Sequence, residues 1–352
     1  MTAPDRRIRI GVIGCGAIAR RAHLPALARL AGQARVVATA DVNLAAAEAA
    51  AADWGADSCD DYRRVLGRSD VDVVLVATPE FLHREQVTAA AQAGKHVLCE
   101  KPMAPSVADA DAMIEACATA GVRLMIGHSR RFTLRYLRIH GALDRGDIGD
   151  VRLMRENERR AQPPGGGYWA GGHWTGDPGR SVGTALTNGI HETDLMRWFT
   201  GSEPVAVAAE HRVTIAGNRG VPDFLTFTVR FADGAVGSSE LVNCAPAGYP
   251  SFHQLELYGT TGSIRARDHD CASVAEYHPD RASFPGIANV LLHDADAYTR
   301  EHAAFLAALR DDAPVPLPPG ESRAALRLAL AAVEAAETGR VAELPLPGEA
   351  AA

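Results

Sequence analysis

The first part of the chain alternates short apolar runs with segments of helical periodicity. Largely apolar runs occupy residues 8–13, 36–40, 73–77, 96–99 and 122–126. The run at 73–77 is continuous, which is typical of a strand buried on both faces. Helices are predicted between the apolar runs, at residues 44–54, 62–66, 82–93 and 106–120. Strands that alternate with helices indicate an α/β fold with a doubly wound parallel sheet. We expect this sheet to form a first domain over residues 1–127.

The pattern changes after residue 127. A helix is predicted at 133–144, an alternating strand at 151–158, and a second helix at 185–199 that ends at Gly201. Later strands are predicted at residues 205–214, 224–231, 235–242, 254–258 and 263–267. Their apolar and polar residues alternate, which indicates an open, mainly antiparallel sheet. With two final helices near 294–309 and 322–337, residues 128–352 are expected to form a second α/β domain, whose last helices can pack back on the first.

The segment 162–183 fits neither pattern. It holds eight glycines and three prolines, and four ring side chains lie among them: Tyr168, Trp169, His173 and Trp174. Loops of this length in compact chains are usually functional or disordered. Two interpretations stay open: a flap whose aromatic faces lie against the apolar face of a sugar, and a mobile connection.

Charge and cysteine usage narrow the class of protein. A formal net charge of −7 and a pI near 6.0 give no attraction to nucleic acid or to anionic lipid, so a small-molecule ligand is expected. The six cysteines show no C-x-x-C pair and no metal-ligand spacing, which fits a reducing cytoplasm. The amino terminus is short and polar, and no apolar run approaches membrane-spanning length, so neither a signal segment nor a membrane span is expected.

A glycine-rich turn follows the first predicted strand. Residues 14–19 read G-x-G-x-x-A between a strand and a helix, the setting in which this motif binds a dinucleotide. The glycines allow a pyrophosphate to approach the helix amino terminus, where free N–H groups favour anions. The second strand ends in Asp41, where a carboxylate can accept two ribose hydroxyls but repels a 2′-phosphate. We therefore expect NAD rather than NADP, with an ordinary helix-capping role as the alternative for Asp41.

Two other strands end in polar or proline-containing turns. The strand at 96–99 stops at Glu100-Lys101-Pro102, and the strand at 73–77 stops at Thr78-Pro79. Ligands of open α/β sheets bind at the carboxyl ends of the strands. A lysine placed there is partly desolvated and can reach a substrate oxygen. Taken alone, Glu100 and Lys101 fit better as a surface pair at the end of a strand, and it is the other motifs that favour a role at the site.

His191 lies in the predicted helix 185–199, with Asp194 one turn later. An imidazole titrates near neutral pH, and a carboxylate one turn away can fix its tautomer and raise its basicity. A buried structural histidine is the alternative. A His/Asp pair at this spacing can also ligate a metal, but no third ligand stands out, so no metal site is expected.

Together these motifs identify a resemblance that covers essentially the whole chain. The segments that carry it are GVIGCGAIA at 11–19, ATPEFLH at 77–83, AGKHVLCEKPMA at 93–104, GHSRRF at 127–132, GDIGDV at 146–151, NGIHETDLMRWFTG at 188–201 and LYGTTGSI at 257–264. In their order and spacing they resemble the glucose–fructose oxidoreductase/inositol dehydrogenase/MocA (GFO/IDH/MocA) family of NAD(P)-dependent oxidoreductases.

The resemblance implies a Rossmann domain followed by an α/β domain whose open sheet makes a subunit interface, in a homodimer or homotetramer. It implies that Lys101 and His191 are the catalytic pair, with the substrate between the nicotinamide and the second sheet. It also implies a cis bond between Lys101 and Pro102. The cofactor contacts that it implies are Gly14, Gly16, Ala17, Ile18, Asp41, Thr78, Pro79, His83, Glu100 and Lys101, with Arg131 near the cofactor or the pocket.

One position departs from the family pattern. Active polyol and sugar dehydrogenases of the family commonly have an aspartate four residues before the histidine, where this chain has Thr187, followed by Asn188. Either His191 works without that partner, steadied by Asp194, or the chemistry differs. The predicted substrate contacts are Arg155, Tyr168, Trp169, His173, Trp174, Thr187, Asn188 and Asp194; Glu156 and His253 are further pocket candidates.

The sequence thus predicts reversible hydride transfer between NAD and a secondary alcohol of a sugar, glycoside or cyclitol. His191 would be the general base, and Lys101 would stabilise the developing alkoxide as an ammonium. Two alternatives stay open: a biosynthetic ketone or imine reductase, or redox-assisted sugar cleavage, within the same family; and an NAD-binding regulator without chemistry.

Overall fold

The computed structural model describes residues 7–161, 174–214, 220–245, 249, 251–268, 273–278, 281–283 and 296–345. The chain divides into two compact units. The first contains residues 1–132 and 295–323, and the second contains residues 133–294 and 324–352. The predicted division into domains 1–127 and 128–352 remains a prediction. Among the described residues, no helix has the length and apolar character that crossing a membrane requires.

The first unit is built on a six-stranded sheet in which all paired strands are parallel. The order across the sheet is β3 (Asp57–Cys59), β2 (Ala34–Ala40), β1 (Ile8–Ile13), β4 (Val73–Val76), β5 (His96–Glu100) and β6 (Leu124–Gly127). The predicted doubly wound parallel sheet is confirmed. The order reverses between β1 and β4, and at such a point open α/β sheets bind ligands beyond the strand ends.

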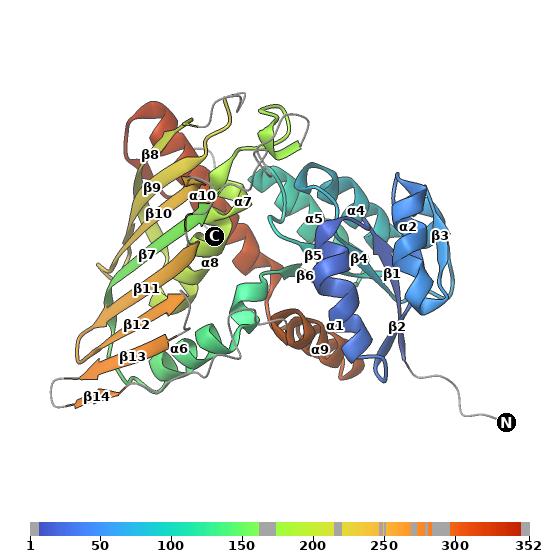
Figure 1. The fold of residues 1–352 in the computed structure, drawn as a ribbon, viewed down its shortest axis with the longest axis horizontal. Helices are drawn as coiled ribbons and strands as arrows, with labels where there is room; N and C mark the ends of the chain where they lie inside the picture. Colours follow the sequence, from blue (N-terminus) through green and yellow to red (C-terminus); the bar gives the residue numbers. More distant parts are fainter. Residues whose placement is uncertain are drawn as a thin grey trace. The chain divides into compact units, whose positions relative to one another are not determined.

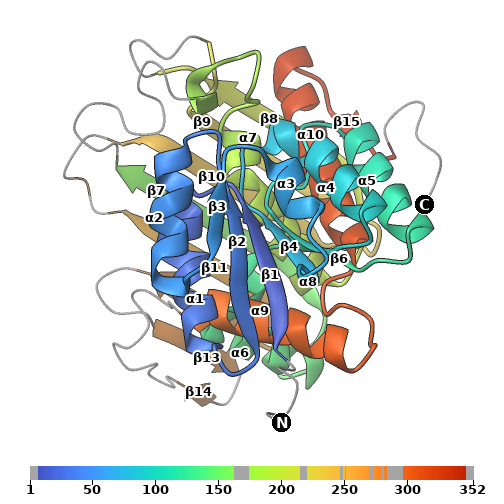
Figure 2. The same ribbon diagram turned by 90° about the vertical axis from the view of Figure 1, so that its right-hand side faces the viewer.

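Helices cover both faces of this sheet (Figure 2). They are α1 (Leu24–Arg29), which continues the π-helical turn η1 (Ala19–His23), α2 (Leu44–Ala51) with η2 (Ala52–Trp54), α3 (Tyr62–Leu66), η3 (Glu80–Leu82), α4 (His83–Gln92), α5 (Val107–Thr119) and η4 (Ser129–Phe132). Ser106 caps α5, since its hydroxyl accepts from the Asp109 backbone N–H and donates to the Asp109 carboxylate. α9 (Asp296–Arg310) also belongs to this unit.

The second unit is built on a nine-stranded sheet (Figure 1). Its order is β14 (Arg281–Ser283), β13 (Ser273–His278), β12 (Ser263–Asp268), β11 (Phe252–Gly259), β7 (Val151–Ala161), β10 (Val236–Ala245), β9 (Phe224–Phe231), β8 (Pro204–Arg212) and β15 (Ala342–Glu343). Only the β7–β10 pair is parallel among the paired strands described, so the predicted mainly antiparallel sheet is confirmed.

Among the described residues, four α-helices belong to the second unit in whole or in part: α6 (Leu134–Asp144), α7 (Thr184–Thr187), α8 (Gly189–Thr200) and α10 (Pro319–Thr338). Side chains of α6, α8 and α10, such as Tyr136, Met196 and Leu328, share one apolar core with inward-facing residues of the sheet. The helix predicted at 185–199 is interrupted, because Asn188 leaves the helical region at φ −125° and ψ −45°. α8 then ends at Gly201, which is left-handed as predicted.

Candidate active site

The glycine-rich turn closes tightly against the end of β4. Gly14 has φ +90°, and a Cβ built there would lie 2.7 Å from the backbone carbonyl of Ala77. Gly16 is exposed, and a Cβ on it would meet no other atom within 4 Å. Ala17 and Ile18 begin the helical segment, so the free N–H groups of its first turn lie next to this open space. The turn therefore has the form that a dinucleotide pyrophosphate requires.

Asp41 follows β2 and turns toward the same segment. One carboxylate oxygen accepts from the Cys15 backbone N–H at 2.8 Å, and the other accepts from the Asn43 N–H at 2.8 Å. The carboxylate thus both steadies the glycine-rich turn and caps the chain before α2. Both roles leave lone pairs for ribose hydroxyls.

Lys101 follows β5 directly, and the bond from Lys101 to Pro102 is cis, as the family resemblance implied. The neighbouring Glu100 is only 5% exposed. One of its oxygens accepts from the Lys101 backbone N–H at 3.0 Å, and the other lies 2.9 Å from His23 Nε2. Burial alone would raise the pKa of Glu100, but the hydrogen bond from His23 and the charges of His23 and Lys101 outweigh it and lower the pKa. Glu100 is therefore a carboxylate beside Lys101.

His83 ties this turn to the end of β4. Its ring is almost fully buried, with Nε2 2.8 Å from the Thr78 carbonyl oxygen and Nδ1 3.0 Å from that of Pro102. Burial lowers the pKa of His83, so the ring is neutral. The Thr78 hydroxyl donates to the Gln86 side-chain oxygen at 2.6 Å. Pro79 is the residue directly before η3. The structure gives His83 a supporting place under the turn, and its predicted contact with the cofactor stays a prediction.

Arg131 lies in η4 and forms an ion pair with Glu321 at 3.7 Å. Its predicted place near the cofactor also stays a prediction.

In the second unit, His191 and Asp194 lie on α8, where both side chains are buried. The first residues of α8 are fixed by a polar network: the side-chain amides of Asn188 and Asn243 on β10 lie 3.2 Å apart, and Asn243 donates to the Thr184 hydroxyl at 3.2 Å. Thr187 is the last residue of α7. The break at Asn188 therefore starts a new helix three residues before His191.

The alternation of β7 decides which of its charged residues face α8. Glu156 and Glu158 are buried on the same face as Met154, whose side chain is in the core with α8. Arg160 has the same parity and pairs with Glu158 at 2.6 Å. Arg155 points to the opposite face, where it lies 4.0 Å from Glu256. Arg155 therefore lies on the face of β7 opposite Glu156, and its predicted substrate contact stays a prediction. Glu158 and Arg160, which the sequence analysis did not single out, share the parity of Glu156.

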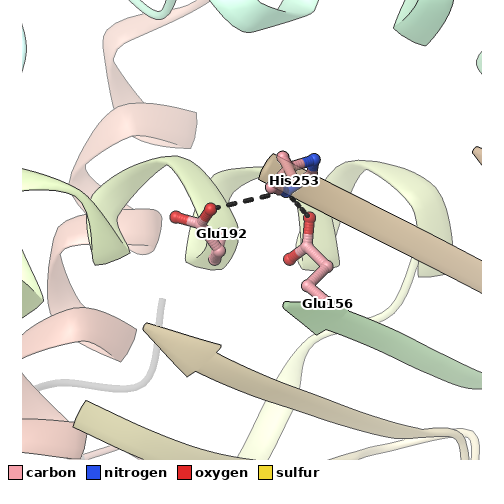
Figure 3. Close-up of side chains that lie close together, drawn as sticks. All are labelled: Glu156, Glu192 and His253. Carbon is pink, nitrogen blue, oxygen red and sulfur yellow. Dashed lines mark ion pairs between the residues drawn. The ribbon is translucent and has the colours of Figure 1, made fainter. Parts of the chain in front are cut away.

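Glu156, Glu192 and His253 form a buried charge cluster between β7, α8 and β11 (Figure 3). His253 Nε2 lies 3.4 Å from a Glu156 oxygen and 3.6 Å from a Glu192 oxygen. Their ligand atoms lie within 4.8 Å of one another, so the three side chains could hold a divalent metal ion. His191 and Asp194 belong to no such group of three within the described part of the chain.

The partners of Tyr136 indicate where the proton of His253 lies. Arg135 donates to the Tyr136 hydroxyl oxygen at 3.1 Å, and this hydroxyl lies 3.0 Å from His253 Nδ1. The simplest arrangement has the hydroxyl donating to Nδ1, so that Nε2 carries the ring hydrogen toward the two carboxylates. A protonated nitrogen has no lone pair for a metal. The prediction that the protein has no metal site stays a prediction, and this proton arrangement agrees with it.

The other predicted substrate contacts lie on the glycine-rich segment after β7. Trp174 begins the short turn η6 (Trp174–Gly176). Tyr168, Trp169 and His173 lie outside the described residues, as does most of the predicted flap.

Comparison with known proteins adds family evidence to this geometry. A family model described as "Oxidoreductase family, NAD-binding Rossmann fold" matches residues 8–128, and the "GFO/IDH/MocA C-terminal domain" matches residues 136–265. The chain belongs to the GFO/IDH/MocA family of oxidoreductases. The resemblance inferred from the motifs is therefore confirmed, and so is NAD as the cofactor of the first unit.

Relatives within the GFO/IDH/MocA family match almost end to end. An inositol 2-dehydrogenase of Rhizobium meliloti is 30% identical over 93% of this chain and 96% of its own length. A 1,5-anhydro-D-fructose reductase of Ensifer adhaerens is 31% identical over 96% of this chain and 98% of its own length. The solved WlbA dehydrogenase of Bordetella pertussis, in complex with NADH and UDP-GlcNAcA, is 27% identical with a TM-score of 0.83, covering 97% of this chain and 99% of that one.

Proposed function

We propose that this enzyme transfers a hydride reversibly between NAD and a secondary alcohol or ketone carbon of a sugar, glycoside or cyclitol. The observation that carries the proposal is Lys101, placed at the carboxyl end of β5 beside an ionised Glu100, within a chain that belongs throughout to a family of NAD-binding oxidoreductases. The relatives named above act on an inositol and on an anhydro sugar, which supports a polyhydroxylated substrate.

The amino-acid usage of the chain supports a specific role for Lys101. The sequence contains 36 lysines and arginines, and only Lys95 and Lys101 are lysines. Lys95 has a structural place, because its ammonium donates to the carbonyl oxygens of Arg68 and Val71 at 2.8 and 2.9 Å. A compact ammonium that arginine cannot replace is the group expected to stabilise an alkoxide at a crowded strand end. We therefore assign Lys101 to electrostatic stabilisation of the developing oxyanion.

His191 is proposed as the general base that takes the hydroxyl proton and returns it in the reverse reaction. Its support is the family position on α8 and the polar network that fixes the start of that helix. Thr187 replaces the family aspartate, so His191 works without that carboxylate. Bound NAD supplies the hydride acceptor at its nicotinamide ring.

The proposal is tested by NADH absorbance with myo-inositol, 1,5-anhydroglucitol, glucose and methyl glucosides, each with NAD and with NADP. Turnover is expected with NAD for one of these classes. We expect Lys101→Ala to lower kcat by about 10²-fold or more, because it removes a charge aimed at the oxyanion, while the Kd for NAD changes little.

Lys95→Arg is the matched control, since it changes the only other lysine outside the site. It should keep wild-type turnover. A Lys101→Ala enzyme that works as fast as wild type would remove Lys101 from the mechanism. Intact NAD binding with no turnover on any substrate of the panel would count against the proposed reaction.

We also infer a cytoplasmic homodimer or homotetramer that binds neither nucleic acid nor membrane. The five cysteines described are free, which supports a reducing compartment. One face of the nine-stranded sheet carries half-buried residues that alternate with the core, such as Asn157 and Gln254, and this face supports pairing with a second copy. Light scattering coupled to size-exclusion chromatography measures the oligomer directly.

A further inference from the structure

A line of buried polar side chains in the first unit ends at Lys101. Glu100 divides its two carboxylate oxygens between partners: Oε2 accepts from the Lys101 backbone N–H at 3.0 Å, and Oε1 lies 2.9 Å from His23 Nε2. The carboxylate therefore holds the backbone of Lys101 on one side and a histidine on the other.

The line continues from His23 to α9. His23 is 0% exposed, and its Nδ1 lies 2.9 Å from Nε2 of His302, which is 2% exposed. The His23 and Tyr298 rings also pack nearly perpendicular to each other, with centroids 5.0 Å apart. His23 is the last residue of η1, and π-helical turns of this kind occur often at functional sites. Three elements, η1, β5 and α9, thus contribute to one polar chain.

The protons in this chain can be placed. Burial, and after it the charge of His23, lowers the pKa of His302 well below its ordinary value, so His302 is neutral. One hydrogen lies between His23 Nδ1 and His302 Nε2, which are 2.9 Å apart. Because Glu100 is ionised, a bare Nε2 facing it would be repelled, so His23 Nε2 carries a hydrogen and donates it to Glu100.

The other titratable groups around the chain do not compensate the Glu100 charge. On α9, burial raises the pKa of Glu301 well above its ordinary value and raises that of Tyr298, with the Glu100 charge adding to both. Burial likewise raises the pKa of Cys99 on β5. These shifts favour the neutral, protonated form of all three groups. Glu100 is therefore a carboxylate surrounded by neutral acids, and its two partners are His23 and Lys101.

We propose that His23 is a positioning residue of the reaction: held by His302, it fixes the Glu100 carboxylate, which in turn fixes the Lys101 backbone and keeps its side chain an ammonium. This inference deepens the proposed function and rests on it for the role of Lys101.

Removal of His23 should act on Lys101 through Glu100. A buried carboxylate that loses its charged or hydrogen-bonding partner takes up a proton more readily. Lys101 would then lose the counter-charge of Glu100, while the Glu80 carboxyl, whose pKa the charge of Lys101 lowers, remains. A partly desolvated lysine that loses one counter-charge gives up its proton at lower pH.

Because the chain contains only two lysines, the change in the Lys101 pKa can be measured without knowledge of the substrate. The full-length protein is labelled with [ε-¹³C]lysine and loaded with NAD, so that its lysine side chains give two ε-carbon signals, which Lys95→Arg assigns. The shift of the Lys101 signal against pH gives the pKa of its ammonium directly.

We expect Glu100→Gln and His23→Leu each to lower the Lys101 pKa by about one unit, the equivalent of a tenfold change. The alkaline limb of the kcat profile should move with it. His302→Gln should stay close to wild type, because its amide can either donate to His23 Nδ1 or accept a hydrogen bond from it. Met113→Ala is the matched control: it removes a fully buried side chain of α5 outside the polar chain, so it lowers stability without moving the Lys101 pKa.

An unchanged Lys101 pKa in both Glu100→Gln and His23→Leu would overturn the proposal. If His23→Leu does not fold, Glu100→Gln decides, and His23→Gln, whose amide can donate to Glu100, should restore the wild-type pKa. The titration does not depend on the role of Lys101 in catalysis. Full activity of Lys101→Ala would overturn that role alone, whereas an inactive Lys101→Ala with an unmoved titration would overturn only the positioning by His23.

Discussion

Glu80 is a carboxyl group inside the first unit, directly after Pro79 at the end of β4. It is 3% exposed, and burial raises its pKa from 4.5 to about 7, against a smaller lowering by its own backbone and by the charge of Lys101. Between these two pH values the folded protein binds more protons at this site than the unfolded chain. Stability from this group is therefore fully present below pH 4.5 and is lost as the pH rises toward 7.

This residue gives a prediction for pH-dependent stability. Wild type should lose about 2.5 kcal/mol more of its free energy of unfolding between pH 5 and pH 8 than Glu80→Gln does, because the amide does not titrate. Urea unfolding at the two pH values measures the difference. Glu85→Gln, on the exposed face of α4, is the control and should behave as wild type. Parallel pH dependence in Glu80→Gln and wild type would contradict the prediction.

At the residue scale, local motifs were predictable and long-range partners were not. Asp41, Glu100 and Lys101 stand at strand ends that the apolar runs already indicate. The bonds from His23 to Glu100 and to His302 join positions 77 and 279 residues apart, and no local pattern encodes such pairings. Arg155 stays a predicted substrate contact: its residue type suits a sugar site, and the strand places it on the face opposite Glu156, 4.0 Å from Glu256.

At the scale of elements, hydrophobic periodicity gave most strands and helices, and it failed where polar contacts override it. α3 and β9 have the bounds that the sequence predicts. β3 was missed because its three residues, Asp57–Cys59, carry no apolar run. The helix predicted at 185–199 splits at Asn188. The backbone of this residue leaves the helical conformation, and its side-chain amide lies 3.2 Å from that of Asn243 on β10.

The turn after β1 allows a matched comparison between two glycines. Gly14→Ala should lower the free energy of unfolding by about 2 kcal/mol or more, since it combines a positive φ with a Cβ 2.7 Å from the Ala77 carbonyl. Gly16→Ala should change stability by less than about 1 kcal/mol, because its Cβ meets nothing within 4 Å.

Gly16→Ala should instead weaken NAD binding, because its methyl group enters the space where the pyrophosphate approaches the helix. Denaturant unfolding and calorimetric titration with NAD separate the two effects. Equal losses of stability in both variants would show that the turn does not distinguish the two positions.

At the scale of the whole molecule, neither unit is a single stretch of chain. The chain passes from one unit to the other after residues 132, 294 and 323, and the last of these points lies within α10. Residues 295–323, where the chain returns to the first unit, complete its apolar core. In this core Phe305, Leu306, Val315 and Leu317 pack with Leu24 and Leu27 of α1. Arg300 also donates to the Phe132 carbonyl oxygen at 2.6 Å.

A fragment experiment follows from this arrangement. Residues 1–132 alone should not melt cooperatively or bind NAD, because the apolar face of α1 loses its cover and His23 loses His302. The same fragment joined through a glycine–serine linker to residues 296–323 should recover both properties. Circular dichroism on heating and titration with NAD measure them. Equal melting of the two fragments would show that α9 is dispensable.

The return of the chain to the first unit also orders events during synthesis on the ribosome. The amino-terminal sheet is made first, but the helix that supplies Phe305 and His302 leaves the ribosome only after residues 133–294 have been added. At ordinary elongation rates this delay lasts on the order of 10–30 s. During that interval the nascent chain lacks both the cover for α1 and the partner for His23. A chain terminated early would therefore stay a target for chaperones and proteases, without competing with the complete enzyme for NAD.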